Sequence, residues 1–452
     1  MKYATYESKV ATRIQWLNEI PRHWGVERLK TVATYCVSNV DKVPADNELP
    51  VRLCNYTDVY YNDLIEPDMG LMETTATVEE IRKFGLRVND VVITKDSEDW
   101  RDIAVAAMVV KSAPDLVCGY HLAIVRPNAK QIYGPFLLRL FESSAVNQQF
   151  QIAASGVTRY GLPKSAIGEA WLPLPPVEEQ QTIARFLDAK TAQIDELIAK
   201  KRLLIAKLKE KRQALIARTV TRGLPPEAAK AAGLEPNPEM KDSGVGWLGA
   251  VPARWEIKAI KWATPVQRGA SPRPIDDPSY FDDDGEYAWV RISDVTAAGM
   301  YLDATEQRLS DLGSSLSVKI EPGGLFLSIA GTVGKPCIAN IKCCIHDGFV
   351  YFPLWKGEPR FLFYLFASGE PYKGLGKMGT QLNLNTDTVG SIVISVPEAA
   401  EQKLITDYLD RTTAELDTMA TTVEAAIDRL TEYRQALITA AVTGKIDVCE
   451  AA

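Results

Sequence analysis

The nine residues WLNEIPRHW at positions 16–24 return as WLGAVPARW at positions 247–255. Both copies keep the two tryptophans, the leucine and the proline. Other motifs repeat in the same order: Glu-Gln at 179–180 returns at 401–402, Leu-Asp at 187–188 returns at 409–410, and RQALI at 212–216 returns at 434–438. A repeat with a long period indicates a repeated architecture. The sequence therefore predicts two halves that are built on the same frame.

The segments between the repeated motifs differ in length and share few residues. Gene duplication followed by random drift is one explanation, but drift should reduce the sequence similarity of the frame as much as that of the inserts. The contrast favours inserts that were selected for different targets. Runs rich in Val and Ile predict strands, and apolar residues at helical spacing predict helices. We expect strands at 88–94, 103–110, 122–126, 287–292, 324–330 and 349–354, and helices at 134–154 and 358–368.

A long run of apolar residues with alternating spacings of four and three follows each insert. The first seam is Ile183, Leu187, Ile194, Leu197, Leu204, Leu208 and Leu215, and the second is Ile405, Leu409, Leu416, Met419, Val423, Leu430, Tyr433 and Leu437. Such heptads are typical of a left-handed coiled coil. Two amphipathic helices that pack separately on globular cores are the alternative. A helix from 183 to 215 would be roughly 50 Å long, and an antiparallel pair would place the inserts at opposite ends.

The expected fold class is α+β, with two mixed α/β domains joined by two long helices. These helices would pair as an antiparallel coiled coil, with a pseudo-two-fold internal repeat. The predicted parts are a first domain with its N-terminal repeated segment at 1–176, a first long helix at 177–222, a linker at 223–246, a second domain at 247–397, a second long helix at 398–445 and a tail at 446–452.

Composition narrows the classes of function. The chain is 46% hydrophobic and 24% charged, as is usual for a globular protein. It has no apolar run of membrane-spanning length and no signal-peptide pattern, and its seven cysteines lack C-x-x-C spacing, which predicts a reduced, cytoplasmic protein. The net charge of -7 argues weakly against a nucleic-acid partner, although nine basic residues stand between Lys200 and Arg222. That run alone is most simply a solvated helix face.

Residues for catalysis or metal binding do not form a recognisable set. DPSY at 277–280 lacks the second proline of an adenine methyltransferase motif, and GTVGKP at 331–336 lacks the first glycine and the Ser/Thr of a P-loop. Residues 374–379 match G-x-G-x-x-G without the strand that should precede it. His121 and His346 precede apolar strands and are expected to be structural. We expect a non-catalytic chain that binds no metal or cofactor; an enzyme that modifies or cuts DNA unaided and a protein-binding scaffold are the alternatives.

Three motifs resemble specificity subunits of Type I restriction-modification systems. They are MKDSGVGWLGAVPARW at 240–255, LPPVEEQQTIARFLD at 174–188 and TAEL at 413–416. The resemblance covers nearly the whole chain, in order and twice over. The second half departs from the pattern at PEAA, residues 397–400, where the Pro-Pro pair is lost, which puts the local entry geometry of the second helix in doubt.

This resemblance implies a DNA-binding subunit in which each insert is a target-recognition domain for one half of a bipartite, asymmetric site. The long helices would dock two methyltransferase subunits that carry S-adenosylmethionine and methylate adenine. Restriction subunits that translocate DNA with ATP and Mg would join through them. Because B-DNA advances about 34–36 Å per turn, the coiled coil would act as a ruler that holds the two half-sites about one turn apart.

Side chains that contact DNA are expected in polar or glycine-flanked loops between strands. Lys and Arg would neutralise phosphates, while Arg, Lys, Asn and Gln would reach base edges. The candidates in the first insert are Lys95, Arg101, Arg159, Tyr160 and Lys164. Those in the second are Arg268, Arg273, Lys335, Lys373, Lys377, Gln381 and Asn383. Each alone is most simply a solvated surface residue, whereas the two sets together favour DNA binding.

Overall fold

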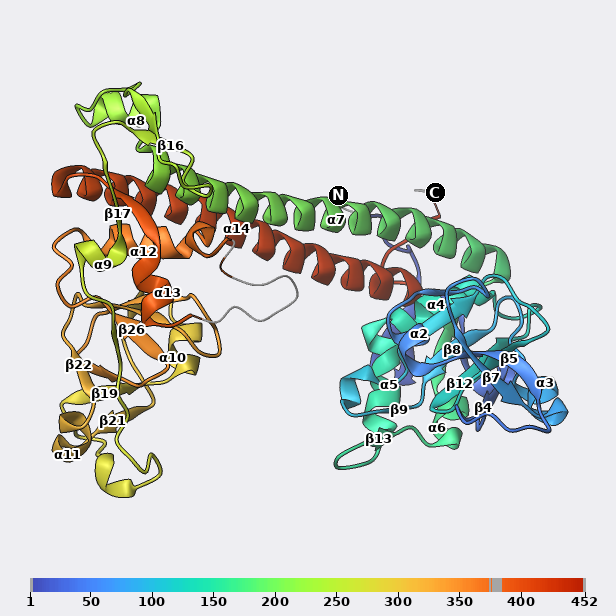
Figure 1. Ribbon diagram of the computed structural model, residues 1–452. Coiled ribbons are helices and arrows are strands. Elements are labelled where there is room, and N and C mark those ends of the chain that lie inside the picture. Colours follow the sequence, from blue (N-terminus) through green and yellow to red (C-terminus); the bar gives the residue numbers. More distant parts are fainter. Residues whose placement is uncertain (1–2, 374, 376–383, 450–452) are drawn as a thin grey trace. The chain divides into compact units, whose positions relative to one another are not determined.

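The computed structural model describes residues 3–373, 375 and 384–449 (Figure 1). The chain forms two units: unit 1 contains Met1–Arg202 and Glu424–Ala452, and unit 2 contains Leu203–Val423. Within the described residues, no helix combines the length and the apolar character that a membrane crossing requires. Unit 1 is therefore assembled from both ends of the chain, and unit 2 from one continuous stretch.

The core of unit 1 lies on both faces of a five-stranded sheet. The strand order is β4 (Ala33–Val37), β12 (Leu122–Pro127), β8 (Val91–Thr94), β10 (Ala106–Val109) and β6 (Leu64–Ile65). Central strand β8 is buried on both sides: Val91 and Ile93 pack in one apolar cluster, and Val92 packs in another. Its unbroken Val-Val-Ile run fits a strand that is covered on both faces. Helices α4 (Gly134–Glu142) and α5 (Ser144–Ala153) contribute to the first cluster.

Smaller elements complete unit 1. The second sheet contributes to the other apolar cluster and consists of β11 (Leu116–Cys118), β5 (Leu49–Cys54) and β7 (Met72–Ala76). Around the sheets are α1 (Leu29–Val32), α2 (Tyr56–Tyr60), α3 (Val78–Phe84), α6 (Lys164–Glu169), the pair β3 (Gly25–Arg28) with β14 (Trp171–Leu174), and the pair β9 (Asp96–Ser97) with β13 (Tyr160–Gly161).

Unit 2 repeats the topology of both main sheets and adds one strand. Its five-stranded sheet has the order β18 (Gln267–Arg268), β26 (Phe349–Tyr351), β23 (Leu325–Ser328), β24 (Pro336–Ala339) and β20 (Tyr301–Leu302). Its second sheet has the order β21 (Gln307–Leu309), β19 (Tyr287–Val290), β25 (Cys343–Ile345) and β22 (Val318–Ile320), of which β22 is additional to the unit 1 pattern. The expected internal repeat is confirmed, and it extends through the inserts.

The helices of unit 2 follow the same plan. They are α9 (Ile260–Ala263), α10 (Ile292–Ala297), α11 (Asp311–Ser315), α12 (Pro359–Ala367) and α13 (Thr386–Ser391), with the pair β17 (Glu256–Ala259) and β27 (Val393–Val396). The six predicted strand regions are confirmed at their centres, as is the helix at 358–368. The single helix predicted at 134–154 is wrong. Ser143 takes an extended conformation and splits the segment into α4 and α5, and its hydroxyl bonds to Thr439.

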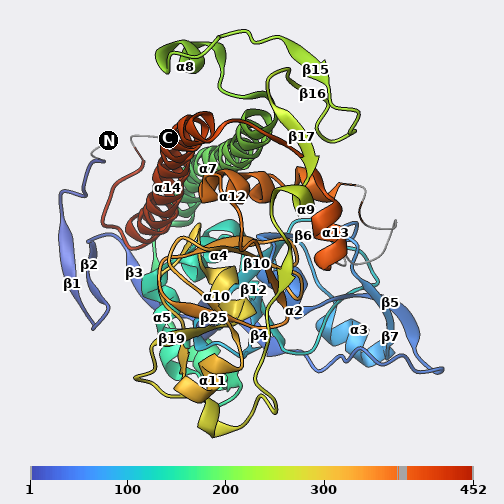
Figure 2. The same cartoon turned by 60° about the vertical axis from the view of Figure 1, so that its left-hand side comes forward.

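Two long helices, α7 (Val177–Arg222) and α14 (Ala399–Val442), run antiparallel wherever they meet. In unit 1 the beginning of α7 packs with the end of α14 in one core, and Asp195 pairs with Arg434 at 3.1 Å. In unit 2 the end of α7 packs with the beginning of α14, and Arg212 pairs with Asp417 at 3.0 Å. The two ion pairs are formed by residues that occupy equivalent positions in the two copies of the repeat. Within each unit, Figures 1 and 2 both show the two helices side by side.

The predicted seam is buried at its ends and open at its centre. Ile183, Leu187, Ile194, Ile405, Leu409, Leu416 and Leu437 are buried. Leu208, Leu215, Val423 and Leu430 are half-buried, whereas Leu197, Leu204, Met419 and Tyr433 are exposed. The end positions are covered because apolar helices of each unit, such as α4 and α12, lie in the same cores as the helix ends. Among the described residues, Leu197, Leu204 and Met419 belong to neither of these cores.

The repeated motifs meet where each long helix leaves its insert. Buried Gln180 accepts from the Tyr133 amide at the start of α4, and Gln402 accepts from the Glu358 amide at the start of α12. At the opposite ends of the helices, Gln435 donates to the Glu142 carbonyl at the end of α4, and Gln213 donates to carbonyls at the end of α12. Each insert is thus held by both long helices, which explains why these residues recur.

The entry segments form matching hairpins. They are β1 (Lys9–Ile14) with β2 (Leu17–Pro21) and β15 (Met240–Asp242) with β16 (Ala250–Pro252). The segment 223–246 also contains α8 (Pro226–Ala231), and Leu224 and Ala229 lie in the unit 2 core. In the first hairpin region, Trp24 donates from its indole N–H to Glu179 at 3.0 Å. The repeated Trp and Glu residues therefore tie the entry segment to α7 in unit 1.

Candidate nucleic-acid interface

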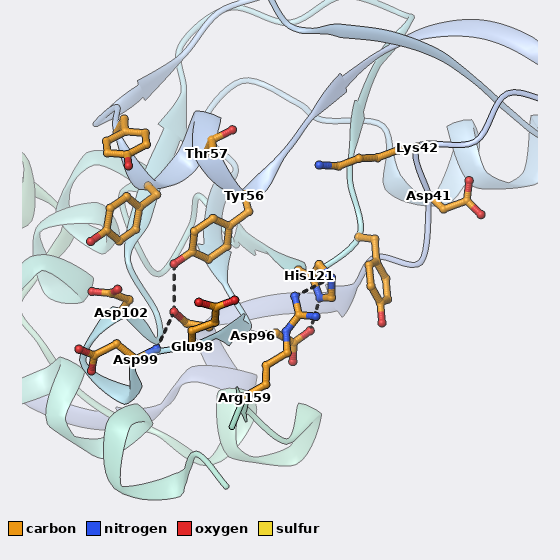
Figure 3. Close-up of a pocket in the computed structure, with 14 residues that line it drawn as sticks. Asp41, Lys42, Tyr56, Thr57, Asp96, Glu98, Asp99, Asp102, His121 and Arg159 are labelled. Carbon is orange, nitrogen blue, oxygen red and sulfur yellow. Dashed lines mark hydrogen bonds and ion pairs between the residues drawn. The ribbon is translucent and has the colours of Figure 1, made fainter. Parts of the chain in front are cut away.

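A hollow of about 830 Å³ lies in unit 1 where three loops meet (Figure 3). One loop follows β8, the second is the turn from β11 to β12, and the third is the segment 155–161 that ends in β13. Backbone bonds join the loops, because the Lys95 amide donates to the His121 carbonyl and the Leu162 amide donates to the Lys95 carbonyl. The ends of β8 and β12 adjoin because the two strands are antiparallel neighbours. The site is therefore built on paired strand ends.

Three side chains form a hydrogen-bonded chain across this hollow. His121 Nδ1 lies 2.7 Å from Asp96 Oδ2, and His121 Nε2 lies 2.8 Å from Arg159 Nη2. Asp96 also binds the ammonium of Lys95. His121 has a backbone φ of +73°, a conformation that costs energy for a residue with a side chain. The fold therefore holds His121 in a strained position between a carboxylate and an exposed guanidinium.

Tyrosines form one wall of the hollow. Tyr56 and Tyr60 stack with ring centroids 5.5 Å apart, and Tyr61 meets Tyr60 edge-on at 5.0 Å. Tyr61 is 77% exposed, so one ring of this wall faces solvent. Burial, followed by nearby carboxylates, raises the pKa of Tyr56, while its contact with Ser97 opposes the shift. The Tyr56 hydroxyl therefore stays protonated at neutral pH and can donate a hydrogen bond.

Acidic side chains outnumber basic ones around the hollow. The lining acids are Asp41, Asp96, Glu98, Asp99 and Asp102, and the lining cations are Lys42 and Arg159. Arg101 binds Asp99 and holds the pKa of that carboxyl below its usual range. Carboxylates repel phosphate, but they accept hydrogen bonds from exocyclic amino groups such as cytosine N4. The hollow therefore suits base edges better than the phosphate backbone.

The matching turn in unit 2 holds two arginines that come from β18 and the segment after it. Arg273 Nη2 lies 3.1 Å from Asp347 Oδ2 in the β25–β26 turn, and Arg268 Nε donates to the carbonyl of the same aspartate at 2.5 Å. Gly269 lies so close to the His346 carbonyl that a side chain there would collide with it. The strand pairings place the β25–β26 turn where unit 1 has the turn that contains His121. Equivalent loops of the two units thus present different side chains.

His346 makes unit 2 sensitive to acid. Its Nδ1 accepts the Gly348 amide at 2.8 Å, so the ring must be neutral at that nitrogen. Burial lowers the pKa of His346, and Asp347 only partly opposes the shift. The folded state then binds fewer protons than the unfolded state, so stability falls as pH drops below about 6.5, the pKa of an unperturbed histidine.

We expect a lower free energy of unfolding for unit 2 at pH 5 than at pH 7. The variant His346→Asn keeps an acceptor for the Gly348 amide and should flatten this dependence. Denaturant titrations of both proteins at the two pH values, followed by hydrogen exchange in β23–β26, test this. Equal pH dependence in the two proteins would show that His346 is not responsible.

Some of the predicted DNA-contacting residues gather at these two sites. In unit 1, Lys95, Arg159 and Tyr160 lie at the joined loops, and exposed Arg101 lies beside Asp99. Lys164 is exposed at the start of α6. In unit 2, Arg268 and Arg273 share Asp347, whereas the Lys335 ammonium binds carbonyls at the end of α10 and Lys373 pairs with Glu370. Lys377, Gln381 and Asn383 lie outside the described residues.

Sequence reasoning missed the residues that organise the hollow. Asp96 and the tyrosines Tyr56, Tyr60 and Tyr61 were not selected, and His121 was interpreted as structural. A signal was present, since Asp96 closely follows one predicted strand and His121 immediately precedes another. Pairing of those two strand ends places the two residues together, but the pairing itself is not visible in the sequence.

The motifs that resemble catalytic loops have other roles or lie outside the described chain. Residues 278–280 form a 3-10 turn, and 331–334 belong to the turn between β23 and β24. The glycine pattern at 374–379 lies almost entirely outside the described residues. In the described part of the chain, no three His, Cys, Asp or Glu residues are grouped so as to hold a metal ion.

The fold and the paired sites place this chain in a known family. The model of the type I restriction modification DNA specificity domain matches residues 24–207 and 254–429, once in each half, so the chain belongs to this family of specificity subunits. The type I restriction enzyme MjaVIII specificity subunit of Methanocaldococcus jannaschii is 22% identical over 447 residues, which are 95% of this chain and 94% of that protein. The resemblance expected from the sequence is thereby confirmed.

Two solved structures share the fold. A chain from a type I R-M system, solved to explain complex assembly and conformational transition, gives a TM-score of 0.70 with 18% identity over 94% of this chain and 98% of that one. The HsdS subunit from Thermoanaerobacter tengcongensis gives a TM-score of 0.52 with 17% identity over the same shares. At these identities the likeness concerns the fold alone.

Proposed function

We propose that this chain reads a bipartite, asymmetric DNA site, one half with each unit, and catalyses no reaction itself. The observation that carries this proposal is one topology with different side chains on and around the equivalent turns β11–β12 and β25–β26. Unit 1 presents His121, Arg159 and a tyrosine wall, and unit 2 presents Arg268, Arg273 and Asp347. A shared scaffold that carries different polar groups recognises different base sequences.

Affinity in this proposal comes mainly from exposed cations around the two sites. Lys42 and Lys164 in unit 1, and Arg273 in unit 2, are exposed and able to meet phosphates. On α7, Lys207, Lys209, Lys211, Arg218 and Arg222 are also exposed. Each phosphate contact releases counterions, so binding should weaken steeply as salt rises.

Catalysis in this proposal belongs to partner subunits. Two methyltransferase subunits with S-adenosylmethionine would dock on the long helices, and restriction subunits with ATP and Mg would join through them. In support, Leu203, Leu204 and Met419 of unit 2 are between 44% and 57% exposed on α7 and α14. Exposed apolar side chains on a helix surface are available for a protein partner to cover. The seven cysteines are all free thiols, which fits the expected cytoplasmic setting.

The test is selection of bound duplexes from a random DNA library by the purified full chain. We expect a motif with two conserved blocks separated by an unconserved gap. A parallel incubation with labelled S-adenosylmethionine should transfer no label to DNA until a methyltransferase partner is added. Label transfer by the chain alone would favour an enzyme, and failure to enrich any motif would favour a protein-binding scaffold.

The length of the long helices should set the gap between the two blocks. Inserting one heptad into each helix, after Arg202 and after Val423, preserves the seam and adds about 10 Å. At about 3.4 Å per base pair, the selected gap should lengthen by about three base pairs while both blocks stay the same. Seven residues inserted at Gly233, in the exposed turn after α8, serve as the control and should change nothing. An unchanged gap in the helix variant would show that the length of the long helices does not set the spacing between the two blocks.

A further inference from the structure

Arg159 is an exposed cation whose guanidinium is held in place by a histidine. The residue lies near the tip of the 155–161 loop, where Val157 is 91% exposed. A free arginine at such a tip would sample many rotamers. Here Nη2 contacts His121 Nε2 at 2.8 Å, and the histidine is itself fixed by Asp96. An arginine that is oriented before binding loses less conformational freedom when it contacts a ligand.

The hydrogen bonds of His121 with Asp96 and Arg159 define which ring nitrogen carries the proton. An arginine side chain can only donate, so His121 Nε2 must accept from it. His121 Nδ1 then carries the proton and donates it to Asp96, which also accepts from the Lys95 ammonium. After one N–H of Arg159 is given to His121, four of its five N–H donors stay available. They form a planar fork, the geometry that matches two acceptors in one plane.

The surroundings of Arg159 favour a base edge over a phosphate. Glu98, Asp99 and Asp102 line the same hollow and would repel a phosphate brought into it. Guanine presents O6 and N7 as paired acceptors in the major groove. Its partner cytosine presents an amino group, which donates a hydrogen bond that a carboxylate can accept. An arginine fork beside carboxylates is therefore complementary to the edge of a guanine-cytosine pair.

We propose that Arg159 reads a guanine in the half-site bound by unit 1, with His121 and Asp96 as positioning residues. This inference rests on the proposed DNA-reading function and adds the chemical identity of one base. The strained backbone of His121 supports it, because strain at φ +73° persists where the surrounding fold demands that position. In unit 2, Arg273 is likewise bound to the turn that matches the His121 turn, through Asp347 at 3.1 Å.

The experiment selects duplexes from a random library with the full-length wild type and with Arg159→Ala, Arg159→Lys, His121→Ala and Lys164→Ala. For Arg159→Ala, we expect the guanine preference at one position of one block to fall about tenfold or more. Arg159→Lys keeps the charge but lacks the fork, so it should lose the same preference. His121→Ala should weaken that preference and leave the other positions alone. Lys164→Ala, a matched exposed cation of unit 1, should weaken all sequences evenly.

A chemical substitution in the DNA provides the second readout. Replacing the selected guanine with 7-deazaguanine removes the N7 acceptor. This should weaken binding of the wild type but leave binding of Arg159→Ala unchanged. If Arg159→Ala weakens every sequence evenly, Arg159 contacts phosphate and the inference is wrong. If Arg159→Lys keeps the full guanine preference, the guanidinium fork does not read the base, which also contradicts the inference. If the wild type itself selects no two-block motif, the proposed function fails with it.

Discussion

Replacing Arg139 with alanine is expected to lower the free energy of unfolding of unit 1 by about 3–5 kcal/mol. Arg139 lies on α4, is 8% exposed, and binds Glu142 at 2.6 Å and Asp188 of α7 at 2.7 Å. Burial raises the pKa of Glu142, and the guanidinium opposes that shift. Without Arg139, the Glu142 carboxylate loses its principal partner in a nearly dry site. The loss should appear in denaturant titrations and as faster hydrogen exchange in α4 and the beginning of α7.

The matched control lies in unit 2. Tyr364 of α12 donates to Asp410 at 2.6 Å, and Asp410 is the repeat counterpart of Asp188. Asp410 keeps its second partner, Arg360, at 2.5 Å. Tyr364→Phe should therefore cost only about 1 kcal/mol. A similar small loss for Arg139→Ala, or a loss spread equally over both units, would contradict the prediction.

Replacing Gln180 with leucine should destabilise unit 1 by about 3 kcal/mol or more. The side chain is fully buried and makes three hydrogen bonds to backbone groups, with the Tyr133 amide at 2.8 Å, the Gln131 carbonyl at 3.0 Å and the Pro175 carbonyl at 2.8 Å. A leucine of similar size would leave all three groups unpaired, at about 1–3 kcal/mol each. The measurement is thermal and denaturant unfolding together with hydrogen exchange at the start of α4.

The neighbouring Gln181 provides the control on the same helix turn. It is exposed, and Gln181→Leu should change stability by less than about 0.5 kcal/mol. In unit 2, Gln402→Leu removes the bonds to the Glu358 amide and the Pro397 carbonyl and should lower stability there instead. Equal effects of Gln180→Leu and Gln181→Leu would show that the buried bonds contribute little.

The frame of the fold could be predicted because its signal is periodic and repeated. Heptad spacing predicted both long helices. Arg212 and Arg434 occupy equivalent positions of the repeat, and so do their ion-pair partners Asp417 and Asp195. The partial exposure of Leu197 could not be predicted, since heptad spacing does not show where neighbouring helices stop covering the seam. Apolar strand runs gave the centres of the strands but not their pairing.

The equivalence of the two inserts was hidden because few of their residues must be alike. Thr94 and Ser328 end equivalent strands, and each donates a hydrogen bond from its hydroxyl to a backbone carbonyl of the next turn. One shared hydroxyl is too little similarity to align the two segments by sequence. Site residues were harder still. Lys335 and Arg159 both stand in loops near glycine, but the Lys335 ammonium binds the carbonyls of α10 while Arg159 faces solvent. Only the three-dimensional neighbours distinguish a structural cation from an available one.

The assembly of unit 1 from both ends of the chain constrains how the protein folds. Leu437, Ile438, Ala441 and Val442, near the C-terminus, are at most 4% exposed in the core that α4 and the beginning of α7 also line. Residues of unit 2 are contiguous, so that unit can close while the last helix is still being synthesised. The apolar core of unit 1 stays incomplete until residues 437–442 have been synthesised, so unit 2 can complete its core first.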